Sequence, residues 1–369
     1  MPSAWYSIEN VAEVPSPALV VYPDRVEENI RRMIRLAGGV DRLRPHIKTS
    51  KLPEVIQMQM DQGITKFKCA TIAEAEMAAA CGAPDVLLAY QPVGPNVSRL
   101  VQLVQTSPKT TFSTLADDEG TIHALSNAAV AAGLTLNLFL DIDCGMHRSG
   151  VAPGSAAAAL YRLIARSPGL AAAGLHAYDG HIRDTDVDAR ARACDEAFDR
   201  VQALRAELRG AGLPVPVLVA GGSPTFPIHA RRSTVECSPG TAVFWDLGYT
   251  RSLPDLDFLP AALLLTRVIS KPGHDLLCVD LGHKAVASEG PHPRVELLDL
   301  PDTRAVGHSE EHLTLETPRA AELPVGASFY GIPWHVCPTV ALHDHAVVVR
   351  DGRAQERWRV VGRTRQITI

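Results

Sequence analysis

Between about residues 40 and 241, short apolar runs alternate with longer segments that have the spacing or composition of helices. The short runs have the length and composition expected of strands. Strands that alternate with helices form parallel βαβ units. The pattern predicts strands at Leu43–Lys48, Lys66–Thr71, Asp85–Tyr90, Thr110–Thr114, Thr135–Asp141, Ala172–Tyr178, Val215–Ala220 and Thr234–Cys237.

The segments between these strands carry helix signals. Pro153-Gly154-Ser155 can cap a helix before an alanine-rich run, and Gly212-Leu213-Pro214 is typical of a helix end. The strand count favours a closed (β/α)₈ barrel over an open sheet, and we expect this barrel to span residues 23–245. Helices are expected at Leu52–Gln62, Ile72–Cys81, Asn96–Gln105, Asp117–Ala132, Ser155–Ala165 and Thr185–Gly210.

The pattern changes after about residue 250. Short β-rich runs separated by proline and glycine turns predict a C-terminal β-domain over residues 246–369. The run Ala18–Tyr22, in an N-terminal segment of residues 1–22, is also β-like and is expected to pair with this domain. The clearest runs of the domain are Ala261–Ser270, Asp275–Asp280, His312–Leu315 and Ala346–Arg350.

Composition and charge exclude several classes of protein. Hydrophobic residues make up 46% of the chain and charged residues 21%, which is ordinary for a globular protein. The net charge of −5 gives no basis for a nucleic-acid or membrane partner. No apolar stretch approaches the roughly 20 residues that cross a bilayer, and the first residues lack a signal-peptide pattern. Seven scattered cysteines predict reduced thiols, so a cytoplasmic protein is expected.

Lys48 is the first candidate for chemistry. In a (β/α)₈ barrel, functional side chains lie at the carboxyl ends of the strands, and Lys48 ends the first expected strand. A lysine in an apolar barrel mouth is costly as a cation, so its pKa is expected to fall, which favours an amine nucleophile. A snorkelling or ion-paired lysine is the alternative that this position alone leaves open.

Two further strand ends carry polar side chains. Asp141-Ile142-Asp143 leads into a glycine turn and Arg148, a set that suits either a polar ligand or a structural ion pair. The sixth expected strand ends in His176 and Tyr178, and His181 follows. An aromatic side chain there can stack on a ring or pack the barrel mouth, and a histidine can move protons.

Two loops favour phosphate binding. Gly221-Gly222-Ser223-Pro224-Thr225 is a glycine-rich turn that opens a short helical segment, and Ser238-Pro239-Gly240-Thr241 follows the last expected strand. Barrels commonly bind phosphate between these two loops, through backbone N–H groups and hydroxyls. With Lys48 across the barrel, the loops predict a phosphate-bearing cofactor that has a carbonyl group, a description that fits pyridoxal phosphate.

The segment Arg44–Lys51 resembles the cofactor-lysine motif of the D-threonine aldolases and D-serine dehydratases, which have an alanine-racemase-like fold. The resemblance implies a pyridoxal-phosphate barrel followed by a C-terminal β-domain, in a homodimer with sites near the subunit interface. Further matching motifs are Ala70-Thr71 with Glu74-Ala75-Glu76, Asp141–Gly150, Gly221-Gly222-Ser223, Glu236 with Pro239-Gly240-Thr241, Asp280–Ala285, Ser309–His312 and Pro333–Pro338.

The resemblance also implies roles for individual residues. Lys48 would carry the cofactor as a Schiff base, and Arg148 would hydrogen-bond its phenolic oxygen. Tyr178 would lie beside the cofactor ring, a place for which His176 competes. The phosphate would be held by Ser223, Gly240 and Thr241, with the backbone N–H of Gly222.

His335-Val336-Cys337 is a candidate metal site. A His-x-Cys pair on an extended segment can hold a metal through nitrogen and sulfur, although alone it is more often a buried cysteine near a structural histidine. The resemblance implies a divalent ion here. The aldolases resemble His-x-Asp, whereas the His-x-Cys form is similar to the zinc-using dehydratases. A thiolate favours Zn²⁺, and a carboxylate suits Mn²⁺ or Mg²⁺.

The resemblance leads to two activities. An aldolase-like lyase would cleave a D-β-hydroxy amino acid into glycine and an aldehyde: the metal lowers the pKa of the β-hydroxyl, and a base removes its proton. The stretches Tyr178–His181 and Trp334–Thr339 favour this activity. The candidates for the base are His181, His308 and His312.

A dehydratase is the alternative. Acting on D-serine or D-3-hydroxyaspartate, it would use Lys48 to remove the Cα proton and would release a 2-oxo acid and ammonia. A non-catalytic regulator that binds pyridoxal phosphate is a hypothesis from a different class. The metal-like pair His335 and Cys337 counts against the regulator, because storage of the cofactor needs no ion.

Overall fold

The computed structural model describes residues 4–369, and the chain divides into two compact units. The barrel unit consists of Arg31–Lys48, Ile56–Gly240 and Thr364–Ile369. The β-rich unit consists of the residues up to Ile30, Thr49–Val55 and Thr241–Arg363. Two helices contain points where the chain passes from one unit to the other, namely α1 (Pro23–Ala37) and α2 (Pro53–Asp61).

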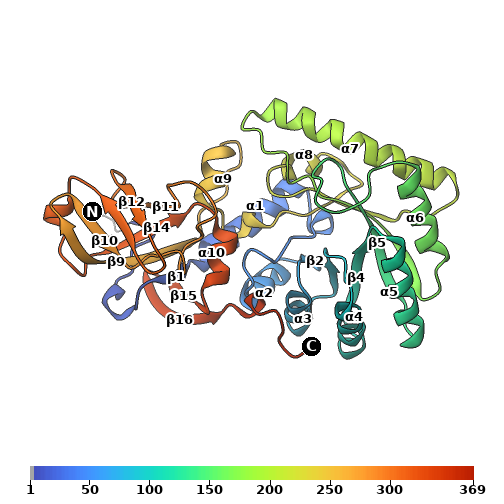
Figure 1. Ribbon diagram of the computed structural model, residues 1–369, viewed down its shortest axis with the longest axis horizontal. Coiled ribbons are helices and arrows are strands. Elements are labelled where there is room, and N and C mark those ends of the chain that lie inside the picture. The colour runs from blue at the N-terminus through green and yellow to red at the C-terminus, as the bar shows by residue number, and fades with distance from the viewer. Residues whose placement is uncertain (1–3) are drawn as a thin grey trace. The chain divides into compact units, whose positions relative to one another are not determined.

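The barrel unit contains a sheet of seven parallel strands, each paired with its neighbours in chain order from β2 to β8. Helices α3 to α6 lie along the outer side of this sheet (Figure 1). The predicted α/β class is confirmed. The elements are β2 (Lys66–Cys69), α3 (Ile72–Ala80), β3 (Asp85–Leu88), α4 (Pro95–Thr106), β4 (Thr111–Ala116), α5 (Glu119–Ala131), β5 (Leu136–Ile142), α6 (Ser155–Arg166), β6 (Leu170–Ala177), α7 (Val187–Gly210), β7 (Val217–Ala220), α8 (Phe226–Ala230) and β8 (Glu236–Cys237).

The expected strand Leu43–Lys48 does not form a regular strand, so the prediction of eight regular strands is corrected to seven. The segment makes only isolated bridges to its two neighbours. Arg44 N donates to Cys237 O on one side (2.9 Å), and Lys68 N donates to Pro45 O on the other (2.8 Å). Pro45 has no N–H, so a continuous ladder cannot form. The segment therefore closes the ring between β8 and β2 as an irregular eighth member.

Apolar side chains from β3, β4, β5 and β7 pack together in the barrel unit. Leu87, Leu115, Phe139 and Val219 form this cluster, and none is more than 2% exposed. Burial of one such side chain contributes about 1.5–3 kcal/mol to stability. Because parallel strands are covered on both faces, they are expected to be apolar throughout. Polar side chains in these strands are therefore exceptions, and such exceptions make up much of the candidate site.

The β-rich unit is built on a nine-stranded sheet, which confirms the β-rich character predicted after residue 250. Its long strand β9 (Ala262–Gly273) pairs with three others. Strand β1 (Ala18–Val21) lies between β9 and β15 (His345–Arg350), which is the pairing expected for Ala18–Tyr22. The other elements are α9 (Leu247–Ser252), β10 (Leu276–Val279), β11 (Val295–Leu297), β12 (Arg304–His308), β13 (Leu313–Glu316), β14 (Ser328–Pro333), α10 (Val336–Leu342) and β16 (Arg353–Arg359).

Helix α1 is absent from the expected helices, although its sequence carries helix signals. Pro23 occupies the first position, and Val26, Ile30 and Met33 are fully buried at helical spacing. Strand β1 ends at Val21, so no loop separates the two elements, and the β-like pattern obscured the helix start. Among residues 4–369, no helix is both long and apolar enough to cross a membrane.

Candidate active site

Three cationic side chains face the ring of Tyr178, which directly follows β6. The Nζ atoms of Lys48 and Lys68 lie 5.9 and 5.6 Å from the ring centroid, and the guanidinium carbon of Arg148 lies 4.9 Å from it. Aromatic faces attract cations. The structure therefore brings together three residues singled out from the sequence, Lys48, Arg148 and Tyr178. It adds Lys68, which sequence reasoning missed.

Two glycines determine where the Tyr178 ring can lie. A Cβ atom at Gly180 would lie 2.4 Å from ring atoms of Tyr178, and a Cβ atom at Gly222 would lie 3.0 Å from its Cε2. A side chain at Gly180 is excluded by this distance, and one at Gly222 would force the ring to move. The ring is thus packed against both the turn after β6 and the predicted phosphate loop after β7.

Lys68 belongs to a buried polar row with His176 and Asp141. Its Nζ lies 3.5 Å from His176 Nε2, and His176 Nδ1 lies 2.7 Å from Asp141 Oδ1. Asp141 and His176 are register partners on β5 and β6, so their side chains lie on the same face of the sheet. Ser149 Oγ donates to the other oxygen of Asp141 (3.0 Å). None of the three row members is more than 7% exposed.

Burial governs the protonation of this row. Burial, followed by the charge of Lys48, lowers the pKa of Lys68 to about 7. Burial also lowers the pKa of His176, and the hydrogen bond with Asp141 offsets this only in part. Burial would raise the pKa of Asp141, but hydrogen bonds from His176 and Ser149 outweigh it and hold the pKa low. At neutral pH the row combines a carboxylate, a neutral imidazole and a partly unprotonated amine.

The sequence Lys66-Phe67-Lys68-Cys69 contains a signal that could have found Lys68. Side chains two residues apart share a face of a strand, and Phe67 and Cys69 are fully buried on the opposite face. A strand that is covered on both faces should be apolar, so its internal lysine needs an ion pair or a function. The strand prediction is confirmed by β2, whereas no role was predicted for Lys68.

The loops after β7 and β8 are joined by a hydrogen bond from Gly240 N to Ser223 Oγ (3.2 Å). Ser223 is 5% exposed, and Gly222 N donates to Thr225 Oγ1 (3.3 Å). Gly221 has a φ of +79°, a conformation that glycine adopts without strain. The loops therefore gather buried N–H and hydroxyl groups, which are the donors that phosphate requires.

Asp179, Cys194 and His229 are buried with their ligand-type atoms all within 4.8 Å of one another, so they offer a possible metal site. His229 Nε2 lies 2.8 Å from Asp179 Oδ2, and His229 Nδ1 lies 2.8 Å from a guanidinium nitrogen of Arg232. A guanidinium only donates, so Nδ1 accepts and Nε2 carries the proton. In this tautomer Nε2 donates to Asp179, and a metal would have to displace that proton.

The same group supports the predicted phosphate loop. Thr225 Oγ1 donates to Asp179 Oδ1 (2.7 Å) and accepts from Gly222 N. A Cβ atom at Gly221 would lie 2.6 Å from the ring of His229. These contacts explain the buried carboxylate and histidine without a metal. We therefore interpret Asp179 and His229 as residues that hold the predicted phosphate loop in place.

The histidines predicted as bases are not members of the buried row. His181 is exposed in the turn after β6, and its Nε2 would lie 3.0 Å from a Cβ atom at Gly145. In the β-rich unit, both ring nitrogens of His308 are occupied, by Arg294 (2.9 Å) and by Leu281 O (3.1 Å). Burial and the charge of Arg294 lower the pKa of His308 to about 4. His312 is exposed in the same unit.

In the β-rich unit, His335 and Cys337 lie at the start of helix α10. His335 has extended backbone and is the N-cap, whereas Cys337 lies in the first turn, so the expected extended segment is corrected to a helix start. Cys337 Sγ lies 3.1 Å from Thr49 Oγ1 and 3.5 Å from Thr241 Oγ1. In the sequence, these threonines directly follow Lys48 and Gly240, which are both predicted to bind the cofactor.

Asp246 explains why α10 begins where it does. Its Oδ2 accepts from Val336 N (3.1 Å), and its Oδ1 accepts from Tyr249 N in α9 (3.0 Å), so one carboxylate satisfies the starts of two helices. Pro338 also suits the first turn of a helix. Asp246 is 2% exposed, and burial raises its pKa to about 6.

Electrostatics couple His335 to Cys337. Burial would raise the pKa of the Cys337 thiol, but its hydrogen bond with His335 and the histidine's charge outweigh burial and lower the pKa. The same interaction overcomes burial at His335 and raises its pKa to about 9. His335 Nδ1 also donates to Glu289 Oε1 (2.5 Å). An imidazole and a thiolate are nitrogen and sulfur donors of the kind that bind zinc.

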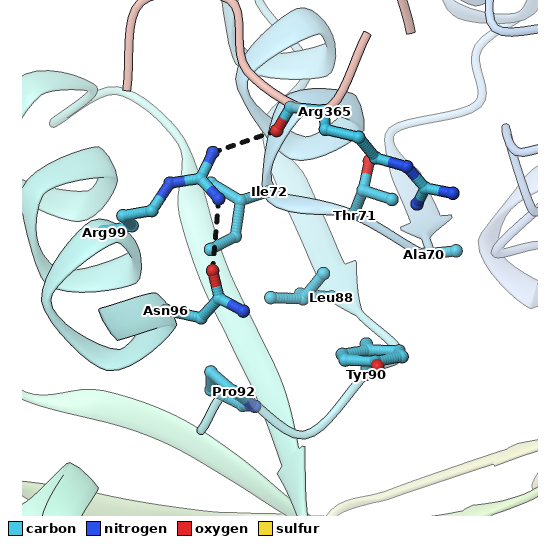
Figure 2. Close-up of a pocket in the computed structure, with 9 residues that line it drawn as sticks. All are labelled: Ala70, Thr71, Ile72, Leu88, Tyr90, Pro92, Asn96, Arg99 and Arg365. Carbon is cyan, nitrogen blue, oxygen red and sulfur yellow. Dashed lines mark hydrogen bonds between the residues drawn. The ribbon is translucent and has the colours of Figure 1, made fainter. Parts of the chain in front are cut away.

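A cavity of about 280 Å³ lies at the carboxyl ends of β2 and β3 (Figure 2). Its lining includes the apolar side chains of Leu88 and Pro92 and the exposed ring of Tyr90. Arg99 donates to Arg365 O (3.1 Å), so the C-terminal residues form one side of the cavity. Because Lys48 also ends its segment at the carboxyl side of the barrel, the cavity and Lys48 share the face that carries function in such barrels.

Two family models match the chain. The model described as "Alanine racemase, N-terminal domain" matches residues 21–247, which is more than half of the chain. The model described as "Putative serine dehydratase domain" matches residues 261–349. The two matches follow one another along the sequence and together cover most of it.

Several known proteins are similar over nearly the whole chain. A D-threonine aldolase of an Arthrobacter species is 31% identical, covering 96% of this chain and 94% of its own. A 3-hydroxy-D-aspartate aldolase of Paracoccus denitrificans is 30% identical (95% and 93%), and a D-threo-3-hydroxyaspartate dehydratase of a Delftia species is 28% identical (96% and 99%). The crystal structure of D-threonine aldolase from Filomicrobium marinum matches with a TM-score of 0.89, at 32% identity over 98% of both chains.

Proposed function

This chain belongs to the alanine racemase N-terminal domain family, and we propose that it is a pyridoxal-phosphate- and metal-dependent lyase that cleaves D-β-hydroxy amino acids to glycine and an aldehyde. The similarity to two aldolases over most of the chain supports this reaction. One observation carries the proposal: Lys48 and Arg148 both approach the ring of Tyr178, which packs against a loop of buried phosphate donors.

The residues around Tyr178 fit pyridoxal phosphate. The cluster of cationic groups suits an anionic cofactor, and Lys48 offers the amine that would bind its aldehyde. Arg148 would donate to the phenolic oxygen. When bound, the cofactor supplies a ring that accepts the electron pair of the bond broken at Cα. The phosphate would be held by Ser223, Gly240 and Thr241 with Gly222 N–H.

His335 and Cys337 would hold the divalent ion in this proposal. Their nitrogen and sulfur donors favour Zn²⁺ over Mn²⁺ or Mg²⁺. An ion at this pair would lower the pKa of the substrate's β-hydroxyl. The thiol contacts Thr49 and Thr241, which directly follow Lys48 and Gly240 in the sequence.

The dehydratase is the second candidate, and one observation favours it. The thiol of Cys337 stands where the aldolase motif has a carboxylate, and a Delftia dehydratase is similar over 96% of this chain. A dehydratase would release a 2-oxo acid and ammonia from the same D-β-hydroxy substrates. A regulator that binds pyridoxal phosphate would release neither set of products.

One experiment separates these functions. Purified holoenzyme is incubated with D-threonine, D-serine and D-3-hydroxyaspartate, and the products are identified by mass spectrometry. We expect glycine and an aldehyde from D-threonine. A 2-oxo acid as the main product would replace the aldolase by the dehydratase, and the absence of product from all three substrates would overturn both.

The predictions about assembly and location are tested separately. The resemblance implies a homodimer, which would give about twice the monomer mass in sedimentation equilibrium. The cytoplasmic location expected from the cysteines would be tested by fractionation of the source cells.

His181 is one candidate for the base that removes the β-hydroxyl proton. The residue is exposed in the turn after β6, and its side chain forms no hydrogen bond within residues 4–369. A His181→Gln variant that keeps the wild-type rate would remove it from the mechanism.

A further inference from the structure

Lys66 and Lys68 lie on the same face of β2, but their surroundings differ. Lys66 Nζ forms an ion pair with Glu236 (2.6 Å). Lys68 is 2% exposed, and within the described part of the chain its amine forms no ion pair with a carboxylate. Its hydrogen-bond partner is His176 Nε2, at 3.5 Å. A buried lysine that only supports the fold is expected to be ion-paired, so the surroundings of Lys68 need another explanation.

Asp141 determines which atoms of the row carry protons. An ionised carboxylate only accepts, so the hydrogen between Asp141 and His176 belongs to His176 Nδ1. Nε2 of the neutral imidazole is then an acceptor, and Lys68 donates one N–H to it. When Lys68 is unprotonated, its lone pair takes no part in this hydrogen bond and is free to accept a proton.

The charges around Lys68 favour the unprotonated amine near neutral pH. Burial is the main cause of its lowered pKa, and repulsion from Lys48 and Arg44 adds to burial, whereas two carboxylates oppose it. The titratable and charged groups that face Lys68 are Lys48, Arg44, Arg148, Asp141, Asp179, His176 and Tyr178.

We propose that Lys68, in place of His181, is the base that takes the proton from the substrate's β-hydroxyl and returns it to Cα, with His176 and Asp141 as its positioning residues. The inference rests on the proposed cleavage reaction. The contacts of Lys68 and Lys48 with one tyrosine ring support it, because the two amines then serve one site.

The proposed step balances without an outside acid or base. The O–H bond breaks, its electron pair becomes the second bond of the aldehyde C=O, and the proton moves to the lone pair of Lys68 Nζ. The Cα–Cβ bond breaks with its electron pair left at Cα. The protonated amine then donates the proton to Cα, which completes glycine. D-threonine contains the same atoms as glycine and acetaldehyde together.

The first test measures the amine itself and needs no bound cofactor. The apoenzyme is labelled with trace acetic anhydride between pH 5.5 and 10.5, and mass spectrometry follows each lysine. We expect a labelling midpoint at about pH 7 for Lys68, against about 10.4 for an ordinary free lysine side chain. A midpoint of about 10 at Lys68 would overturn the proposal, because the amine would then be a cation at the pH of the reaction.

The second test measures cleavage of D-threonine by holoenzyme variants. Lys68→Met is expected to lower kcat/KM by at least about 100-fold, because general base catalysis is worth that much. It should also remove the rise of kcat/KM with pH through about 7 that the wild type should show. Lys68→Arg keeps a cation but offers no base, so it should not restore the rate. Lys66→Met, the matched control, should keep the pH dependence.

The outcomes separate the two proposals. Wild-type cleavage together with an unchanged rate and pH profile in Lys68→Met or Lys68→Arg would overturn the base assignment alone. Wild-type holoenzyme that releases no aldehyde would overturn the proposed function and the proton step with it. If Lys68→Met does not fold, Lys68→Gln replaces it, and the labelling midpoint on the wild-type chain still decides the state of the amine.

Discussion

The two ends of the barrel strands differ in how their cationic side chains are paired. At the amino ends, Arg44 contacts both oxygens of Asp85 (2.7 and 3.0 Å) and one oxygen of Glu236 (2.7 Å), while Lys66 contacts the other (2.6 Å). Two cations there meet two carboxylates. At the carboxyl ends, Lys48, Lys68 and Arg148 face one tyrosine ring.

This difference separates the groups that hold the barrel together from those that work on a ligand. Burial opposes the charge of Arg44, yet its carboxylate partners raise its pKa above the usual value. At Lys68 two carboxylates offset burial only in part, so its pKa falls. Removing one partner from a buried ion-pair network is destabilising, so the charges at the amino ends support the fold. Cations without such partners suit an anionic ligand, and an amine with a lowered pKa suits a base. The predictions below test this division, from the largest expected effect to the smallest.

The largest effect is expected at Lys48. Lys48→Ala should lower activity by at least about 1000-fold, because no other amine should bind the cofactor productively. Borohydride reduction of the wild-type holoenzyme should attach the pyridoxyl group to the Lys48 peptide, as read by mass spectrometry. Attachment to Lys68 in an active Lys48→Ala variant would break the assignment of the two amines.

At the amino ends, stability should change instead of activity. Glu236→Gln removes the carboxylate that Arg44 and Lys66 share, so the free energy of unfolding should fall by about 3 kcal/mol. Urea denaturation measures this loss, and kcat should stay within about twofold of the wild type. A variant of full stability and low activity would show that this network serves catalysis.

Changes at His335 and Cys337 test whether activity needs a metal ion in addition to the residues at the carboxyl ends of the strands. Chelation of the metal, or Cys337→Ser, should lower activity by about 100-fold or more while the spectrum of the bound cofactor persists, because a change to an outer partner of a ligand alone costs about 10- to 100-fold. Glu289→Gln, which changes only a partner of His335, should have a smaller effect. Full activity in protein shown to be free of metal by elemental analysis would remove the ion from the mechanism.

The smallest effect concerns the stability of the apoenzyme at Lys68. The pKa of Lys68 is about 7 in the folded chain and about 10.4 when unfolded, so between these values the unfolded chain binds more protons and wild-type stability rises with pH. The penalty for burying the cation is fully present below about pH 7. Lys68→Met should therefore be more stable than the wild type at pH 6, by about 1–2 kcal/mol.

The pH dependence of that difference is the decisive measurement. Thermal melts should show the advantage of Lys68→Met fading as the pH rises from 7 toward 10, because the wild-type amine is then neutral in both states. Lower stability of the variant at every pH would mark Lys68 as a structural lysine. The cations at the two ends of the strands would then not differ in role.

Sequence patterns predicted regular strands and helices more reliably than interrupted strands or helices that directly follow a strand. The predicted strand that contains Lys68 is β2, and the long helix α7 begins within two residues of its expected start. The segment Leu43–Lys48 was predicted as a strand from its place in the alternation of strands and helices, but Pro45 interrupts its ladder. Helix α1 was missed because strand β1 leads into it without a loop.

The sequence by itself determined the fold class and the residues that local motifs mark, because strand periodicity, glycine turns and the lysine motif are all properties of neighbouring positions. Lys48, Ser223 and Gly240 were predicted in this way. Only the tertiary structure decided that Lys68 meets His176, 108 positions further along the chain, while Lys66 meets Glu236. The protonation of a lysine depends on burial and on partners from other strands, so two lysines on one strand can differ although their local sequence is nearly the same.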